Sequence, residues 1–165
     1  MSYLDPFALA AALPRERLRH TCWAGWTGIV FTTRLRRLFS RAARIIPIDP
    51  DRAVMSGLAM GGFTLERGWN LVWFPEGGRS ADGQLQRFLP GVGALVEKHP
   101  VPIVPVYIEG GFSAWPAARK FPRPHRITVR FGEVIDPRPL IASTAEPARD
   151  QEIASAIRAR VAALA

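Results

Sequence analysis

The segment FPEGGRS, residues 74–80, gathers side chains that could bind a phosphorylated substrate. A carboxylate, two glycines, a guanidinium and a hydroxyl follow one another, directly after an apolar stretch that ends in Phe74 and Pro75. Adjacent glycines permit a sharp turn or the close approach of a ligand, and an arginine can hold a phosphate through two hydrogen bonds. Glu76 could pair with Arg79 or hold a substrate hydroxyl. Taken alone, the segment is equally consistent with a strand-to-loop turn that carries a surface ion pair.

A second candidate, Asp5, stands among the opening residues MSYLDPFALAAALP. Aspartate is a favoured helix N-cap, and the following Pro6 suits the first helical position. The simplest interpretation is a helix over residues 6–13 that ends before Pro14.

The elements that must position these groups follow an alternating plan. Helical composition is found at 6–13, 52–67 (ending at Gly68), 91–97 and 146–165, and apolar strand-like runs at 20–31, 70–76, 101–109 and 126–135. The arginines of residues 14–20 read as a solvated stretch. Strands that alternate with helices indicate an α/β fold with a mainly parallel or mixed sheet flanked by helices, formed as a single domain over residues 1–165.

Residues 34–46, RLRRLFSRAARII, predict a basic amphipathic helix. Leucine, phenylalanine and isoleucine recur at helical spacing, with four arginines toward the other side. Two interpretations remain open for this segment. It could be an ordinary surface helix packed on the sheet, or it could lie against an anionic membrane surface.

Composition limits the partners and the compartment. The formal net charge of +8 rests almost wholly on arginine, since Lys98 and Lys120 are the only lysines. Such a chain favours anionic partners: phosphorylated substrates, membrane surfaces or nucleic acid. The single cysteine, Cys22, excludes an internal disulfide and agrees with a reducing compartment. We expect no metal site, no signal peptide and no spanning helix, because the necessary ligand clusters and long apolar runs are missing.

Three blocks of the sequence resemble the 1-acylglycerol-3-phosphate acyltransferase family, the glycerophospholipid acyltransferases. FPEGGRS is similar to the family's F-P-E-G-T-R-S block, with Gly78 where threonine is common, and VPIVPV at 101–106 is similar to its block of valine, proline and aliphatic residues. IPIDPDR at 46–52 resembles the block whose arginine, here Arg52, helps to bind the glycerol phosphate. The blocks occur in the family's order, so the resemblance extends over nearly the whole chain.

The family's remaining block, N-H-x-x-x-x-D, is incomplete here. If Asp5 is its aspartate, the histidine that acts as general base would stand one residue before Met1, and the apolar strand leading into it would be missing too. We expect either a longer natural protein, of which this chain is a fragment or a gene-model artefact, or a genuine short form that is catalytically crippled; we favour the former. His20, His99 and His125 have no carboxylate at the motif spacing, so none is expected to replace it.

The resemblance implies transfer of a fatty acyl group from acyl-CoA or acyl-carrier-protein to a lysophospholipid hydroxyl, with no covalent enzyme intermediate, metal or cofactor. It assigns Asp5 to catalysis and the following residues to substrate binding: Arg52, Glu76, Gly77, Gly78, Arg79 and Ser80; Arg87 could add charge on the acceptor side. We expect a cytoplasmic protein, peripheral on the inner face of the membrane, that has little turnover as this chain stands. The alternative is a non-catalytic module that binds anionic membranes. No nucleic-acid recognition motif is present, so nucleic acid is not an expected partner.

Overall fold

The computed structural model describes the chain except for residues 1, 27–31, 49–53, 117–118 and 120. The predicted site residue Arg52 lies outside the described residues. In chain order the helices and strands are α1 (Asp5–Ala12), α2 (Arg15–Arg19), β1 (Thr21–Trp26), α4 (Arg34–Ala42), β2 (Ile45–Ile48), α5 (Val54–Glu66), β3 (Asn70–Val72), α6 (Gly91–Lys98), β4 (Val106–Glu109), α7 (Gly111–Ala114), β5 (Thr128–Phe131), α8 (Pro137–Ala142) and α9 (Arg149–Ala162).

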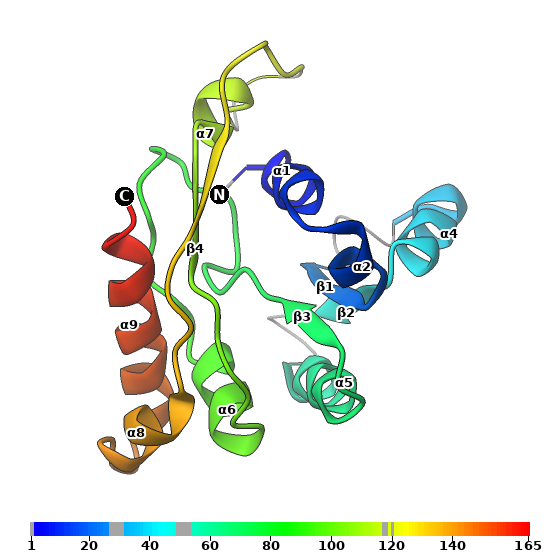
Figure 1. Ribbon diagram of the computed structural model, residues 1–165. Helices are drawn as coiled ribbons and strands as arrows, with labels where there is room; N and C mark the ends of the chain where they lie inside the picture. Colours follow the sequence, from blue (N-terminus) through cyan, green and yellow to red (C-terminus); the bar gives the residue numbers. More distant parts are fainter. Residues whose placement is uncertain (1, 27–31, 49–53, 117–118, 120) are drawn as a thin grey trace.

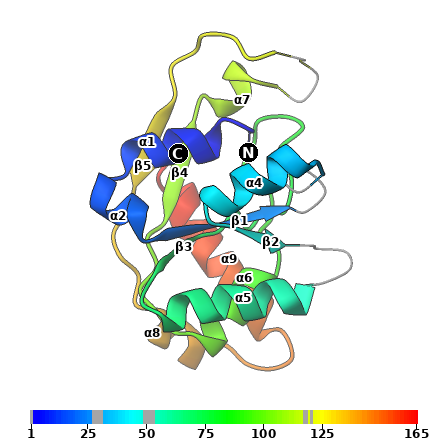
Figure 2. The ribbon, with the colours of Figure 1, turned by 90° about the vertical axis from the view of Figure 1, so that its right-hand side faces the viewer.

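The described strands form two sheets. β1 lies between β2 and β3 and pairs with both in parallel, while β4 and β5 form a separate antiparallel ribbon. Helices α4 and α5 lie on opposite sides of the parallel sheet (Figures 1 and 2). This arrangement confirms the predicted α/β fold with parallel strands flanked by helices. The prediction that an inner strand is missing stays a prediction.

The hydrophobic core lies around α9, which packs on α6, α8 and β4. Its buried members come from three segments of the chain: Phe88, Val96, Ile153, Ala154, Ile157 and Val161. The close approach of α6 to α9 needs a glycine, because a Cβ on Gly93 would lie 1.8 Å from the backbone oxygen of Asp150. The core therefore depends on a helix crossing as well as on apolar burial.

Several predicted elements are confirmed, with small changes at their ends. The helices expected at 6–13, 91–97 and 146–165 are α1, α6 and α9. The helix expected over 52–67 is α5, and Gly68 after it has φ +73°. Glycine takes this left-handed conformation without steric cost, which is why helices commonly stop there.

The arginine-rich stretch 14–20 contains helix α2, which has no buried residue, as expected of a solvated stretch. Two other local predictions were wrong, and the first concerns Ile45 and Ile46, which belong to strand β2 instead of the preceding helix. That helix ends because Arg44 takes a left-handed φ of +55°, after which the β-branched isoleucines pair with β1. The strand expected over 101–109 is regular only from Val106, since Pro105 has no N–H to donate to a ladder.

Candidate active site

The loop after β3 carries the FPEGGRS segment and folds back on itself. Gly77 has φ +69°, and the amide of Leu89 donates to the carbonyl of Pro75 at 2.8 Å. One Glu76 oxygen, Oε2, accepts from the backbone amide of Gln86 at 3.0 Å. Glu76 thus helps to close the loop, and its position is set by the backbone ten residues further along the chain.

The two glycines of the segment differ in their surroundings. A Cβ on Gly77 would lie 2.4 Å from Cδ1 of Leu89, whereas a Cβ on Gly78 would have no heavy atom within 4 Å. Gly77 is therefore favoured by its positive φ, whereas its neighbour Leu89 is a flexible side chain that could shift. Gly78 faces open space, so a Cβ at this position would meet no neighbour.

Ser80 is buried inside the loop and organises it. Its hydroxyl donates to Oδ1 of Asp82 and accepts from the amide of Gly83, both at 2.8 Å. The hydrogen bond from the Gln84 amide, followed by that from Ser80, lowers the pKa of the Asp82 carboxyl. The hydroxyl of Ser80 is committed to these contacts, and its predicted role in substrate binding stays a prediction.

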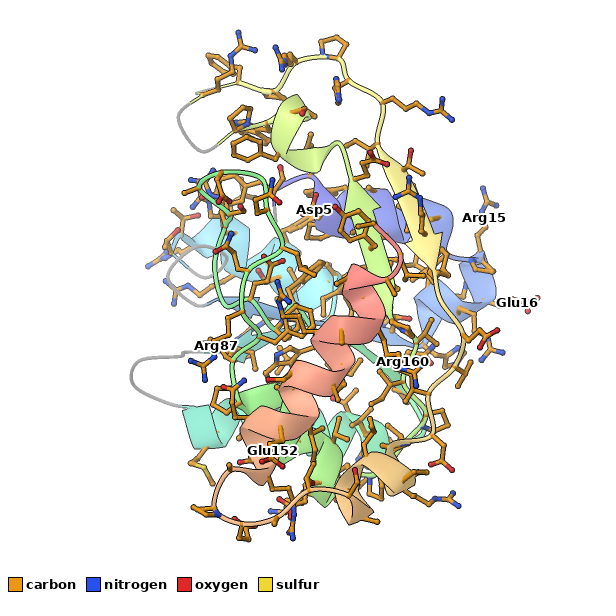
Figure 3. All side chains as sticks on the ribbon, turned by 90° about the vertical axis from the view of Figure 1, so that its left-hand side faces the viewer. Asp5, Arg15, Glu16, Arg87, Glu152 and Arg160 are labelled. Atoms are coloured by element: carbon orange, nitrogen blue, oxygen red, sulfur yellow. The ribbon has the colours of Figure 1, made fainter. Side chains whose placement is uncertain are left out.

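Asp5 is buried at the start of α1, close to the end of β4 (Figure 3). Its Oδ2 accepts a hydrogen bond from the backbone amide of Ser2, but its Oδ1 is buried with no hydrogen-bond partner among the described residues. A Cβ on Gly111 would lie 2.0 Å from this oxygen, so only a glycine fits beside it. Burial raises the pKa of Asp5 to about 6, and the nearby charge of Glu76 adds to the rise.

An aromatic pair joins Asp5 to the FPEGGRS loop. The guanidinium carbon of Arg79 lies 4.1 Å from the ring centroid of Tyr3, two residues before Asp5. Tyr3 in turn packs edge-to-face on Trp115, with ring centroids 5.5 Å apart. Cation–π contacts of this kind favour a fixed guanidinium position. The structure thus brings together Asp5 and Arg79, which the sequence predicted as site residues.

A hollow of about 250 Å³ lies beside Asp5. Its other lining residues come from the loop after Ser80 and from the β4–α7 segment: Asp82, Gly83, Tyr107, Ile108, Glu109, Gly110, Phe112 and Ser113. A second hollow of about 430 Å³, lined by His125, Arg126, Thr128 and Arg130, shares Glu109 and Gly110 with the first. Both hollows are open to solvent.

The three histidines of the chain all fall within the described residues, and no hydrogen bond joins any of them to Asp5. Nδ1 of His20 lies 3.2 Å from the carbonyl of Glu16, and the His99 ring is 3.5 Å from Glu66. His125 lines the second hollow. The structure supplies no imidazole partner for Asp5 from the described part of the chain.

Some residues of this site had no sequence signal. Tyr3 and Trp115 fix Arg79 and the start of α1, yet nothing in their local sequence marks them as site residues. Arg87, weighed as a source of acceptor-side charge, donates to Gln151 of α9 at 2.7 Å, and its role on the acceptor side stays a prediction. Within the described ranges no group of three or more acidic, histidine or cysteine side chains is placed to hold a metal ion.

The fold is that of an α/β protein with a parallel sheet flanked by helices. The structure is similar to the crystal structure of the 1-acyl-sn-glycerophosphate (LPA) acyltransferase PlsC from Thermotoga maritima, with a TM-score of 0.74 over 99% of this chain and 62% of that chain, at 20% identity. A family model described as Acyltransferase matches residues 1–109. The chain therefore belongs to the acyltransferase family, as the three sequence blocks predicted.

Curated relatives point to the same family. The chain is 35% identical over 88 residues to the 1-acyl-sn-glycerol-3-phosphate acyltransferases of Limnanthes alba and Limnanthes douglasii, and 32% identical to that of Cocos nucifera. The matched part is 53% of this chain but only 31%, 31% and 29% of those proteins. The chain thus spans about a third of the length of these relatives.

No helix in the described part of the chain is both long enough and apolar enough to span a membrane.

Proposed function

We propose that the protein to which this chain belongs transfers a fatty acyl group to the free hydroxyl of a 1-acylglycerol-3-phosphate. Two observations carry the proposal. Asp5 has a buried Oδ1 with no hydrogen-bond partner among the described residues, and Tyr3, two residues before it, contacts Arg79 of the FPEGGRS loop. The printed names of the curated relatives support the same acceptor.

In the proposed reaction an imidazole acts as general base. The acceptor oxygen attacks the carbonyl carbon of an acyl thioester while the imidazole takes the hydroxyl proton. The C–S bond then breaks, and the leaving thiolate receives that proton. Asp5 would accept a hydrogen bond from the other ring nitrogen and stabilise the imidazolium, as carboxylates do in catalytic triads.

The electrostatic state of Asp5 supports this role. An unpaired acceptor oxygen in a buried site costs free energy, and here burial also raises the pKa of the carboxyl to about 6. A neighbouring imidazolium would satisfy Oδ1 and favour the charged carboxylate, because an opposite charge lowers a carboxyl pKa. We propose that an imidazole occupies this position in the active protein.

The acceptor phosphate would bind to Arg79, with Arg52 as a second cation. Arginine suits this task because its planar fork can hold two phosphate oxygens at once. The backbone around Gly77 and the open space at Gly78 would let the glycerol portion approach Glu76. Ser80 would act within this same substrate-binding loop.

The donor would be acyl-CoA or an acyl-carrier-protein thioester, which is a substrate, and the reaction as proposed needs no cofactor. Since the acceptor is a lipid, we propose that the protein works from the cytoplasm as a peripheral protein on the inner face of the membrane.

The decisive experiment places an Asn-His pair directly ahead of Met1, released from a cleavable tag, and compares it with a matched Asn-Gln pair. Thiol release is measured with a 1-acylglycerol-3-phosphate and an acyl-CoA or acyl-carrier-protein. We expect the histidine form to be faster by about 10²- to 10⁴-fold, the usual contribution of a positioned general base. Equal turnover by the 165-residue chain would contradict the role of the imidazole. An in-frame Asn-His codon pair upstream of Met1 would identify the natural residues.

Substitutions in the histidine form separate the roles. We expect Arg79→Ala to raise KM for the acceptor, and Asp5→Asn to lower kcat because the imidazolium loses its partner. Arg138→Ala is the matched control, since Arg138 is an exposed arginine of α8 that pairs with Asp136. An Arg79→Ala variant with an unchanged KM would remove Arg79 from the acceptor site.

A second candidate is a non-catalytic module that binds anionic membranes, which the exposed apolar side chains of the arginine-rich helix α4 favour. Vesicle binding without acyl transfer, even in the histidine form and in the natural longer chain, would select this alternative.

A further inference from the structure

Helix α4 turns its apolar side to solvent. Leu35, Leu38 and Phe39 are 77%, 66% and 57% exposed. At about 100° per residue these side chains fall within an arc of roughly 100° on the helix surface, so they form one continuous stripe. Three large apolar side chains on one exposed stripe are unusual for a surface helix, which normally turns that stripe toward the core.

The opposite side of α4 faces the protein. Ser40 is 1% exposed, and α4 packs against β2. On the helix surface Ser40 lies roughly 150° from the centre of the apolar stripe. The helix is therefore inverted relative to an ordinary amphipathic helix: its small polar residue is buried, and its leucines and phenylalanine point outward. In Figures 1 and 2 α4 lies at the outside of the molecule, beyond the parallel sheet.

Arginines flank the stripe, and α4 contains no acidic residue. Arg34 and Arg41 lie along one edge and Arg36 beyond the other, with Arg37 next to Arg41. No described carboxylate forms an ion pair with Arg34, Arg37 or Arg41. The helix is also capped, because the Thr33 hydroxyl accepts from the amide of Arg36 at 3.2 Å. α4 thus presents a well-formed apolar stripe with three arginines nearby, Arg34, Arg37 and Arg41, that form no ion pair with a described carboxylate.

We infer that α4 docks on an anionic lipid bilayer, with Leu35, Leu38 and Phe39 inserted among the acyl chains and the arginines at the level of the phosphates. Interfacial helices bind through buried apolar area together with attraction to anionic lipids, and α4 offers both on one side. Nucleic acid would satisfy the arginines but leave the apolar stripe in water. The inference stands on α4 alone and does not require acyl transfer by this chain.

The test measures binding of the 165-residue chain to vesicles of phosphatidylcholine alone and of phosphatidylcholine with phosphatidylglycerol, by flotation. We expect binding to the anionic vesicles to be stronger by about tenfold or more and to weaken as salt is raised. The triple variant Leu35→Ser, Leu38→Ser, Phe39→Ser should lose about tenfold or more in affinity for them. The variant Arg34→Gln, Arg37→Gln, Arg41→Gln should lose the preference for anionic lipid.

Helix α5 provides the matched control. Met55 and Met60 are also exposed, at 76% and 44%, but no arginine lies on α5. Met55→Ser with Met60→Ser should leave vesicle binding unchanged. Equal loss in the α4 and α5 variants, or unchanged binding when the α4 stripe is replaced, would overturn the inference. Because all the replaced side chains are exposed, circular dichroism should show each variant folded.

Insertion of the α4 stripe into the bilayer can be measured by the fluorescence of a dye attached to the helix. In a Cys22→Ser background, an environment-sensitive dye on Leu38→Cys should shift to shorter wavelength when anionic vesicles are added, and the same dye on Met60→Cys should not. An acidic protein can be added in place of vesicles as a comparison. If the emission of the dye at position 38 shifts with that protein and not with vesicles, α4 binds a protein partner and the inference is overturned.

Discussion

Helices α9 and α4 carry similar apolar stripes but meet opposite environments. Ile153, Ile157 and Val161 of α9 are 0%, 4% and 6% exposed, whereas the leucines and the phenylalanine of α4 are mostly exposed. α9 packs on α6, α8 and β4, while α4 packs on β2 through its polar side. An apolar stripe in the sequence therefore predicts that one side of a helix contacts an apolar partner. It does not predict whether that partner is the protein core or another molecule.

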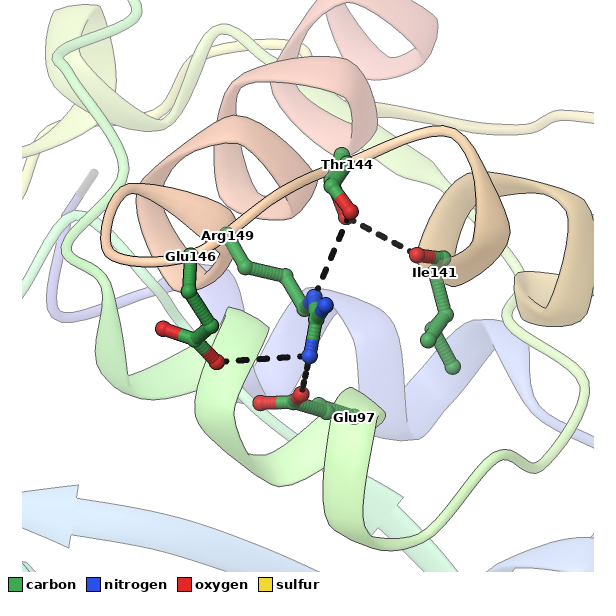
Figure 4. A network of polar contacts seen from close by, with 5 residues as sticks. All are labelled: Glu97, Ile141, Thr144, Glu146 and Arg149. Atoms are coloured by element: carbon green, nitrogen blue, oxygen red, sulfur yellow. Dashed lines mark hydrogen bonds and ion pairs between the residues drawn. The ribbon is translucent and has the colours of Figure 1, made fainter.

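Polar groups show the same contrast between the two regions. At the start of α9, Arg149 bonds to Glu97 and Glu146 and to the carbonyl of Thr144, whose hydroxyl donates to the carbonyl of Ile141 (Figure 4). At the start of α1, Asp5 keeps a buried oxygen without a described partner. Around α9 the apolar side chains are packed and the polar groups of Arg149 are hydrogen-bonded. Around Asp5 and α4, a buried carboxylate oxygen and an exposed apolar stripe are suited to binding another group.

The contrast in packing predicts the largest effect for a core substitution. Ile153→Ala should lower the free energy of unfolding by about 2–5 kcal/mol, because it removes buried methyl groups and leaves a cavity. Leu38→Ala on α4 should change it by only about 0.5 kcal/mol or less. Urea denaturation followed by circular dichroism measures both. Similar losses for the two variants would mean that α4 is packed as closely as α9.

Asp5 should make stability depend on pH. Its pKa is raised from 3.8 to about 6, so the folded state favours the protonated form. That contribution is complete below about pH 4 and is lost as the pH rises through about 6, a change of about 3 kcal/mol at about 1.4 kcal/mol per pKa unit. The unfolding free energy of the unmodified chain, relative to Asp5→Asn, should fall by this amount between pH 4 and 7. A constant difference would show that Asp5 has an ordinary pKa.

Two glycines sharpen the comparison further. Gly93→Ala would place a methyl group 1.8 Å from a backbone oxygen of α9 and should cost about 1–3 kcal/mol through overpacking. Gly78→Ala in the substrate loop has open space and should leave stability nearly unchanged. Thermal melts of the two variants provide the measurement. A costly Gly78→Ala would mean that the loop is closed where the structure has it open.

A smaller effect than that of either core substitution is expected at Arg149. Its partners are partly exposed, so Arg149→Gln should lower the denaturation midpoint less than Ile153→Ala or Gly93→Ala, and the loss should shrink at high salt. Denaturation at low and high salt tests this. A large, salt-independent loss would indicate that the network around Arg149 is a buried part of the core.

The sequence by itself determined the class of fold, the family and most helices, because these depend on local patterns. Alternating apolar runs, Gly68 after α5 and the FPEGGRS block are all readable along the chain. It could not place Ile45 and Ile46 correctly, because their strand depends on pairing with β1 after the left-handed turn at Arg44.

Only the tertiary structure decided how the site is assembled. The contact of Arg79 with Tyr3 joins segments more than 70 residues apart, and the unpaired oxygen of Asp5 is defined by burial against Gly111. The same holds for α4, whose stripe is visible in the sequence but whose outward orientation follows from Ser40 being buried. Spacing along a chain shows which residues share a face, whereas exposure and partners depend on what the rest of the chain covers.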